Sequence, residues 1–118
     1  MKLDTAIKYI VKNWETLSSK QDVGYSYPKS VAVWVAKSDL ADSYEVDEEW
    51  IGISPQGNIV WAYASGCSCW GGEYTEDKQP TLKTVTFSHK HIKEEWADAI
   101  IKFTKEKKMQ ELPRYSRY

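Results

Sequence analysis

The chain has 118 residues and a formal net charge of −1, because 17 acidic residues nearly balance 16 lysines and arginines. This length suits one domain and is too short for two well-packed ones. The small net charge excludes an overall field that would steer the protein to nucleic acid or acidic lipid. A hydrophobic content of 42 % excludes disorder of the whole chain. We therefore expect one folded domain with a single core.

The N-terminal segment predicts an amphipathic helix over residues 3–18. Apolar residues recur there every three or four positions, and Asp4, Lys8 and Lys12 interrupt the apolar pattern. These charges argue against a signal peptide or a membrane span. The two cysteines form one Cys-x-Cys, which is too few for a disulfide framework. We therefore expect a cytoplasmic protein in a reducing compartment.

Two very different segments follow the predicted helix. Residues 31–36 are a run of strand length that is apolar on both faces, which predicts a covered strand. Residues 39–49 contain six acidic residues and no basic one. A run of like charges is typical of a solvated segment, so we expect a loop or a short helix there.

Residues 50–65 predict a β-hairpin. The sequence Ser54-Pro-Gln-Gly-Asn58 offers proline for the first turn position and glycine for a left-handed one. Pairing Ser54 with Asn58 predicts two apolar faces, one formed by Ile51, Ile53, Ile59 and Trp61 and the other by Trp50, Gly52, Val60 and Ala62. Because both faces are apolar, we expect the hairpin to lie centrally in a sheet.

The C-terminal half predicts one more strand and one more helix. Residues 66–72 read as a compact loop, and residues 73–83 as a polar excursion. Residues 84–87 predict a strand, and the apolar spacing from His91 predicts a helix that ends near Lys108.

This order of elements predicts an α+β domain. We expect an antiparallel sheet of about four strands with an N-terminal and a C-terminal helix, in the order α-β-β-β-β-α. Residues 1–110 would form this single domain. Residues 111–118 would form a polar C-terminal tail, because they show no periodicity and Pro113 bars a helix.

Two pairs of metal-ligating residues share one spacing. Cys67-Ser-Cys69 and His89-Lys-His91 together form a Cys2His2 set, and residues two apart on an extended backbone face the same side. Such a set suits tetrahedral Zn²⁺, and four protein ligands would make the metal structural. The alternative is that the cysteines pack in a loop and the histidines lie on the surface.

A thiol enzyme is a further alternative. It would need one cysteine held as thiolate by a nearby histidine. No motif for such an arrangement, and no phosphate-binding or dinucleotide-binding fingerprint, occurs in the sequence.

The tryptophans have several predicted roles. Trp14 and Trp96 fall on the apolar stripes of their helices and predict core positions. Trp34, Trp50 and Trp61 lie in predicted strands, where we expect them to pack under the helices. Trp70 lies on a glycine-flanked loop and is either a lid over the core or an exposed anchor for a partner.

The C-terminal region is basic, with lysines from 102 to 108 and Arg114 and Arg117 interleaved with tyrosines. This pattern admits a nucleic-acid contact, but the slightly negative net charge argues against one. A solvated helix face with a frayed tail accounts for it equally well.

The sequence Ser65-Gly-Cys-Ser-Cys69, which follows a Trp-bearing hairpin, resembles a family of small proteins largely from bacteriophages and prophages. The resemblance covers about residues 30–75, and Trp70-Gly-Gly-Glu-Tyr74 departs from the family's pattern after the motif. It implies a small accessory protein in the host cytoplasm that acts on a host factor. We expect no cofactor, with zinc as the alternative.

The sequence therefore favours a non-enzymatic protein that binds and modulates a host protein, with a defence protein as one candidate. The expected binding residues are on the cysteine loop and the acidic stretch: Trp70, Tyr74, Asp42, Glu45, Asp47 and Glu48. A zinc-stapled domain that uses Cys67, Cys69, His89 and His91 is the first alternative, and a thiol-dependent enzyme is the second.

Overall fold

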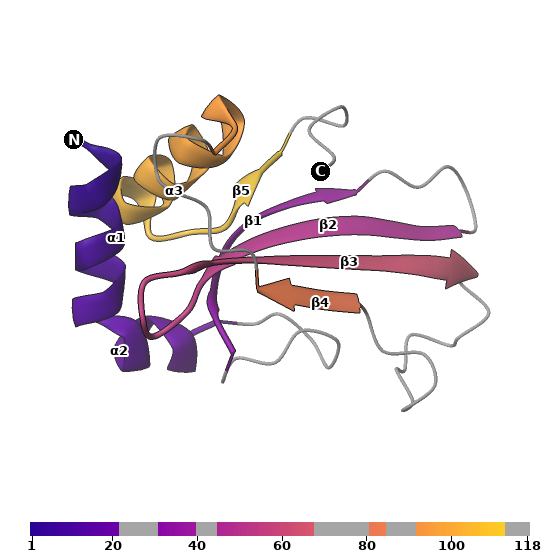
Figure 1. The fold of residues 1–118 in the computed structure, drawn as a ribbon, viewed down its shortest axis with the longest axis horizontal. Coiled ribbons are helices and arrows are strands. Elements are labelled where there is room, and N and C mark those ends of the chain that lie inside the picture. The colour runs from indigo at the N-terminus through magenta and orange to yellow at the C-terminus, as the bar shows by residue number, and fades with distance from the viewer. Residues whose placement is uncertain (22–30, 40–44, 68–80, 85–91, 113–118) are drawn as a thin grey trace.

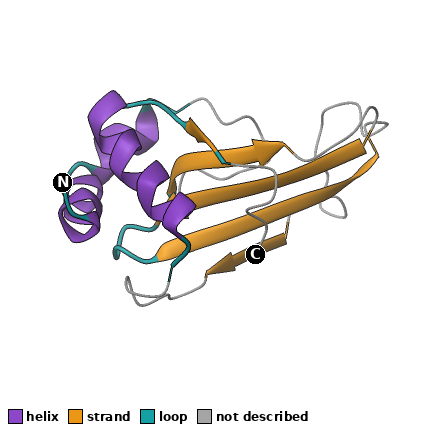
Figure 2. Ribbon diagram, turned by 90° about the horizontal axis from the view of Figure 1, so that it is seen from above, coloured by secondary structure: helices purple, strands orange, loops and turns teal. Residues whose placement is uncertain are grey.

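The computed structural model describes residues 1–21, 31–39, 45–67, 81–84 and 92–112. In these residues the helices gather at one end of a long sheet, and the strands run away from them (Figures 1 and 2). The elements in chain order are α1 (Leu3–Lys12), α2 (Trp14–Ser19), β1 (Val33–Asp39), β2 (Glu45–Ile53), β3 (Ile59–Cys67), β4 (Thr81–Thr84), α3 (Glu94–Glu106) and β5 (Gln110–Glu111). The predicted α+β class is confirmed.

The predicted N-terminal helix is divided in two at Asn13. The backbone of Asn13 leaves the helical region with φ −108° and ψ 21°. Its side-chain Nδ2 donates to the Tyr9 carbonyl at 2.9 Å, the same oxygen that accepts from the Asn13 backbone N–H. Asparagine side chains compete with the helix for backbone groups in this way, which accounts for the break.

The β2–β3 hairpin has the predicted register. Ile53 pairs with Ile59 and Gly52 with Val60, and Gly57 adopts the left-handed conformation with φ 85°. Two bonds close the turn, because the Ser54 N–H donates to the Asn58 carbonyl at 2.9 Å and the Asn58 N–H donates to Ser54 Oγ at 3.0 Å. The hairpin is also central, since the sheet order is β4-β3-β2-β1-β5.

The expectation of a purely antiparallel sheet is corrected. Strands β1 to β4 pair antiparallel, but β5 lies parallel to β1, which makes the sheet mixed. The C-terminal helix is therefore followed by a two-residue strand, and residues 113–118 of the predicted tail lie outside the described residues. Leu112 is also buried, and its N–H donates to the Lys37 carbonyl at 2.7 Å, so the packed chain continues past residue 110.

The sheet has an apolar core on each face. The larger core joins the sheet to α1 and α3 and contains Ile10, Val33, Val35, Ile51, Ile53, Ile59, Trp61, Trp96, Ile100 and Phe103. The second core, on the other face, contains Ala32, Trp34, Trp50, Val60 and Ala62. Trp61 and Trp96 thus pack with the helices as expected, and Trp14 is half-buried beside them. The expectation that Trp34 and Trp50 also lie under the helices is wrong.

A side chain extends the sheet at the edge of β1. Gln21 Oε1 accepts from the Trp34 N–H at 2.8 Å, and Gln21 Nε2 donates to the Trp34 carbonyl. The amide therefore satisfies both backbone groups of one strand residue, as a neighbouring strand would.

No helix in the described part of the chain is long and apolar enough to cross a bilayer.

Gly52 carries a stability prediction, because it lies in the central strand directly against the second core. A Cβ on Gly52 would lie 2.7 Å from Ala32 Cβ and 2.8 Å from Trp34 Cε3, both closer than van der Waals contact. We expect Gly52→Ala to lower the free energy of unfolding by about 1–3 kcal/mol through overpacking, measured by urea denaturation.

Gly57→Ala is the matched control. A Cβ on Gly57 would meet nothing closer than 3.5 Å, so its cost of about 1 kcal/mol would come from the left-handed backbone alone. Gly57→Asn should recover part of that loss, because asparagine tolerates this conformation. A Gly52→Ala protein as stable as the wild type would contradict the close packing of β1 on β2.

Candidate functional site

The described part of the acidic stretch is strand, which corrects the expected loop or helix there, and residues 40–44 lie outside the described residues. Asp39 ends β1, and Glu45 to Glu49 form the outer half of β2. Each of these β2 residues pairs with a β3 residue, from Glu45 with Cys67 to Glu49 with Tyr63. Strand pairing with a neighbour outweighs the low strand propensity of acidic residues, so the segment is held on a regular backbone.

The acidic residues of β2 differ in exposure. Glu49 is completely buried, and its cross-strand neighbour Ser38 is only 2 % exposed. Glu49 therefore belongs to the interior and is not accessible to a second protein. Glu48 is half-buried and stays accessible at the surface.

Glu48 is tied to an aromatic cluster. The Trp50 indole Nε1 donates to Glu48 Oε2 at 2.9 Å, and the Lys37 ammonium lies 5.3 Å from the centroid of the Trp50 ring. Trp50 packs edge-on against Trp34, with centroids 6.1 Å apart and planes at 83°. A carboxylate, an indole and an ammonium thus form one ordered group, which is a preorganised polar patch.

The register brings together the two segments that the sequence singles out. Glu45 is the first residue of β2 and pairs with Cys67, the last residue of β3. The acidic half of β2 and the cysteine motif therefore meet at one end of the sheet, the end that lies away from the helices (Figure 1). Asp47 occupies the same end, paired with Ser65.

The other predicted site residues lie outside the described ranges. These are Asp42, Trp70, Tyr74, Cys69, His89 and His91. Cys67 is located only as the final position of β3. Within the described residues no group of three or more metal-ligating side chains converges, and the zinc and thiol alternatives stay predictions.

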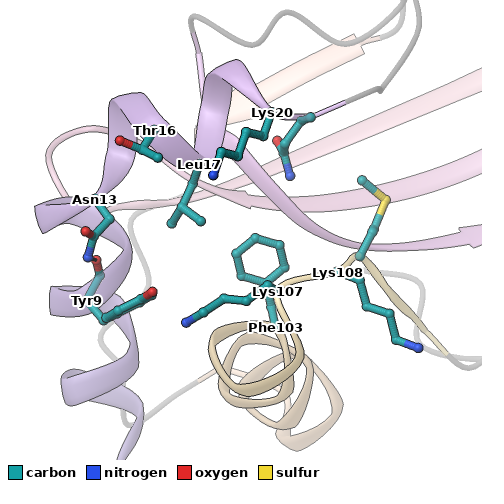
Figure 3. Close-up of a pocket in the computed structure, with 10 residues that line it drawn as sticks. Tyr9, Asn13, Thr16, Leu17, Lys20, Phe103, Lys107 and Lys108 are labelled. Carbon is teal, nitrogen blue, oxygen red and sulfur yellow. Dashed lines mark hydrogen bonds between the residues drawn. The ribbon is translucent and has the colours of Figure 1, made fainter.

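A cavity that the sequence does not predict lies at the helical end. It has a volume of about 420 Å³ and lies between α2 and the end of α3 (Figure 3). Its lining combines apolar, amide and ammonium groups from Tyr9, Asn13, Thr16, Leu17, Lys20, Gln21, Phe103, Lys107, Lys108 and Met109. None of these described lining residues is acidic.

Lys107 is held in an unusual conformation beside this cavity. It ends α3 in the left-handed region with φ 59°, and its N–H donates to the Phe103 carbonyl at 2.8 Å. A non-glycine residue in this conformation costs about 1 kcal/mol. Its ammonium donates to the Thr104 carbonyl at 2.6 Å and lies 3.9 Å from the centroid of the Tyr9 ring. Lys107 is therefore both strained and precisely placed.

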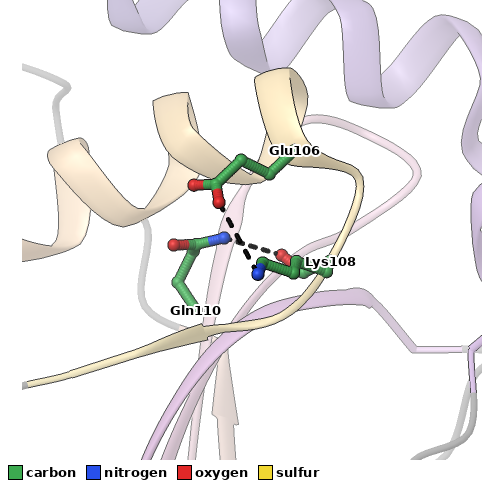
Figure 4. Close-up of polar contacts among 3 residues, drawn as sticks. All are labelled: Glu106, Lys108 and Gln110. Atoms are coloured by element: carbon green, nitrogen blue, oxygen red, sulfur yellow. Dashed lines mark hydrogen bonds and ion pairs between the residues drawn. The ribbon is translucent and has the colours of Figure 1, made fainter.

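Lys108 is arranged differently. Its ammonium lies 3.8 Å from Glu106 Oε1 in an exposed ion pair, and its carbonyl accepts from Gln110 Nε2 at 2.9 Å (Figure 4). In Figure 3 its side chain extends away from Leu17 and Phe103. Of the three lysines, Lys20 and Lys107 are the two directed into the cavity.

Local pattern could not have identified this cavity. The lysines near residue 108 suit the negative end of a helix, which explains them without a ligand. The feature that makes them a site is that α2 and the end of α3, about 90 residues apart in the chain, line the same cavity. The sequence gives one signal of the site. It is a lysine at the end of the predicted C-terminal helix, where helices commonly have glycine.

Comparison of the chain with protein-family models, with curated proteins and with solved structures found no match. The function must therefore be argued from the residues and geometry described above.

Glu48 generates a prediction. Glu48→Ala removes the acceptor of a nearly buried indole N–H, so we expect a loss of about 1 kcal/mol in the free energy of unfolding. The Trp50 indole signal in a ¹H–¹⁵N NMR spectrum should also shift and exchange faster with solvent. Glu48→Gln is the control, because its amide oxygen still accepts, and the loss should be smaller. Equal stability of Glu48→Ala and wild type would show that this bond contributes nothing.

Proposed function

We propose that the protein is a non-enzymatic binding protein that docks on another protein through the end of the sheet where β2 begins and β3 ends. The observation that carries this proposal is the pairing of Glu45 with Cys67. It joins the acidic half of β2 and the cysteine motif into one candidate surface. We call this end of the sheet the acidic end, defined by Glu45, Asp47 and Glu48 of β2 and by Cys67 of β3. Strand positions alternate between the two faces of a sheet, so Glu45 and Asp47 occupy positions on one face and Glu48 a position on the other.

The geometry of the acidic end favours recognition of a basic partner surface. Its backbone is held in a nine-residue strand within the sheet, so the acidic groups are attached to a rigid element. Rigid presentation reduces the ordering entropy that binding would otherwise cost. Charge complementarity of this kind mainly raises the association rate and the specificity.

The expected resemblance to phage and prophage proteins gives this proposal its setting. In that setting the partner would be a host protein in the cytoplasm, with a defence protein as one candidate. An acidic surface can occupy a basic groove that normally holds a phosphate backbone, which makes a nucleic-acid-binding host protein the partner class of choice.

Charge reversal tests the proposal. We expect Glu45→Lys/Asp47→Lys to lose a partner that the tagged wild-type protein captures from a lysate of its source cells, quantified by mass spectrometry. Trp70→Ala should weaken the same capture if the chain after Cys67 takes part. Partner recovery should also fall as salt rises, because exposed charges are screened.

The matched control is Glu15→Lys/Asp98→Lys, which makes the same change in formal charge at exposed positions of α2 and α3. The control should keep the partner. Circular dichroism would verify that both double variants fold. Equal loss of the partner from both variants would show that net charge alone governs binding. Retention of the partner by both variants would show that the acidic end is not the binding surface.

A further inference from the structure

The cavity at the helical end combines features of a site for a small organic anion. Its volume of about 420 Å³ falls within the range of pockets that hold small ligands. Leu17 and Phe103 supply apolar walls, and Lys20 and Lys107 enter from α2 and from the end of α3 (Figure 3). The cavity lies at the opposite end of the sheet from the acidic end (Figure 1), so this inference is independent of the proposed function.

The lysines exceed what helix capping alone requires. Lys20 and Lys107 follow the last residues of α2 and α3, where each helix end carries at most about half a negative charge. Each ammonium carries a full positive charge, and no described lining residue is acidic. The cavity therefore keeps a positive potential after both helix ends are neutralised.

Lys107 is exposed to solvent, and its ammonium is nevertheless held in place by two contacts. An ammonium has three donors, of which the Thr104 carbonyl takes one and the Tyr9 ring faces the group. At least one donor remains for a further acceptor. The left-handed backbone places a lysine where glycine would fit without strain, and conformational strain of this kind gathers at functional sites.

Amide groups of the lining are already engaged. Asn13 donates to the Tyr9 carbonyl, and Gln21 holds both backbone groups of Trp34. The ammonium groups of Lys20 and Lys107 and the apolar walls are therefore the main groups that can select a ligand, with the hydroxyl groups of Tyr9 and Thr16 beside them. This division suits a molecule with one anionic group and a flat apolar body.

We propose that this cavity binds a small organic anion, with its anionic group between Lys20 and Lys107 and its apolar body against Leu17 and Phe103.

The probe for this proposal is 2-naphthoate, titrated into the full-length protein and followed by ¹H–¹⁵N NMR. Its neutral counterpart is 2-naphthalenemethanol, which has the same ring system without the charge. We expect naphthoate to shift signals of the lining residues and to bind roughly 10-fold more tightly than the alcohol, as a charge-assisted hydrogen bond would give.

Three variants locate the binding. Lys20→Gln and Lys107→Gly should each weaken naphthoate binding roughly 5- to 10-fold through loss of one ammonium. The control is Lys105→Gln, at an exposed position of α3 outside the cavity lining, which should leave the affinity nearly unchanged. Lys107→Gly also relieves the strained backbone, so it should unfold at an equal or higher urea concentration than the wild type. Weaker binding by this variant could then not be ascribed to a damaged fold.

Four results would overturn the proposal: no naphthoate binding at millimolar concentration, equal affinity for the alcohol, shifts confined to residues away from the cavity, or unchanged affinity in Lys20→Gln and Lys107→Gly. Unchanged affinity in these two variants would mean that Lys20 and Lys107 only cap their helices.

Discussion

The hydrogen-bonded turn between β2 and β3 is the constraint on which the rest of the structure depends. Both faces of this hairpin are apolar, so burial alone does not choose between one register and the register shifted by one residue. The turn makes that choice, because Ser54 binds Asn58 twice and Gly57 takes the left-handed conformation. That register sends Ile51 and Ile53 to the helices and sets Gly52 against Trp34. It also determines that Glu45 pairs with Cys67, because each lies eight residues along its strand from the Ile53–Ile59 pair beside the turn.

The parts of the fold that could be predicted are those that residues close together in the sequence determine. The hairpin turn, the strand at 31–36 and the apolar stripe of α3 each carry their pattern within a short stretch, and each appears in the structure. The acidic residues of β2 could not be assigned from their own composition, because their strand state comes from pairing with β3. β5 was missed for the same reason, since its two polar residues, Gln110 and Glu111, become a strand only beside β1.

The two candidate sites show the same division between local and distant information. The acidic run was visible in the sequence, but its exposure was not, and Glu49 is an interior residue while Glu48 is partly accessible. The basic cavity could not be predicted from the sequence, because Lys20 and Lys107 are far apart in the chain. They line the same cavity only in the folded protein. The long sheet separates these regions, with the acidic residues of β2 at one end and the helices that line the cavity at the other (Figure 1).

The Gln21 amide has a consequence for the behaviour of the protein in a crowded solution. A strand with free backbone groups at its edge is a template on which another chain can add. At β1 that edge is occupied by Gln21 at Trp34 and by β5 at Ala36 and Lys37, so two short elements share the task of closing it. The Gln21 side chain thereby makes the two backbone hydrogen bonds at Trp34 that a residue of a neighbouring strand would make. Protection of this edge of β1 from edge-to-edge aggregation is thus divided between one uncharged amide at Trp34 and a strand of only two residues.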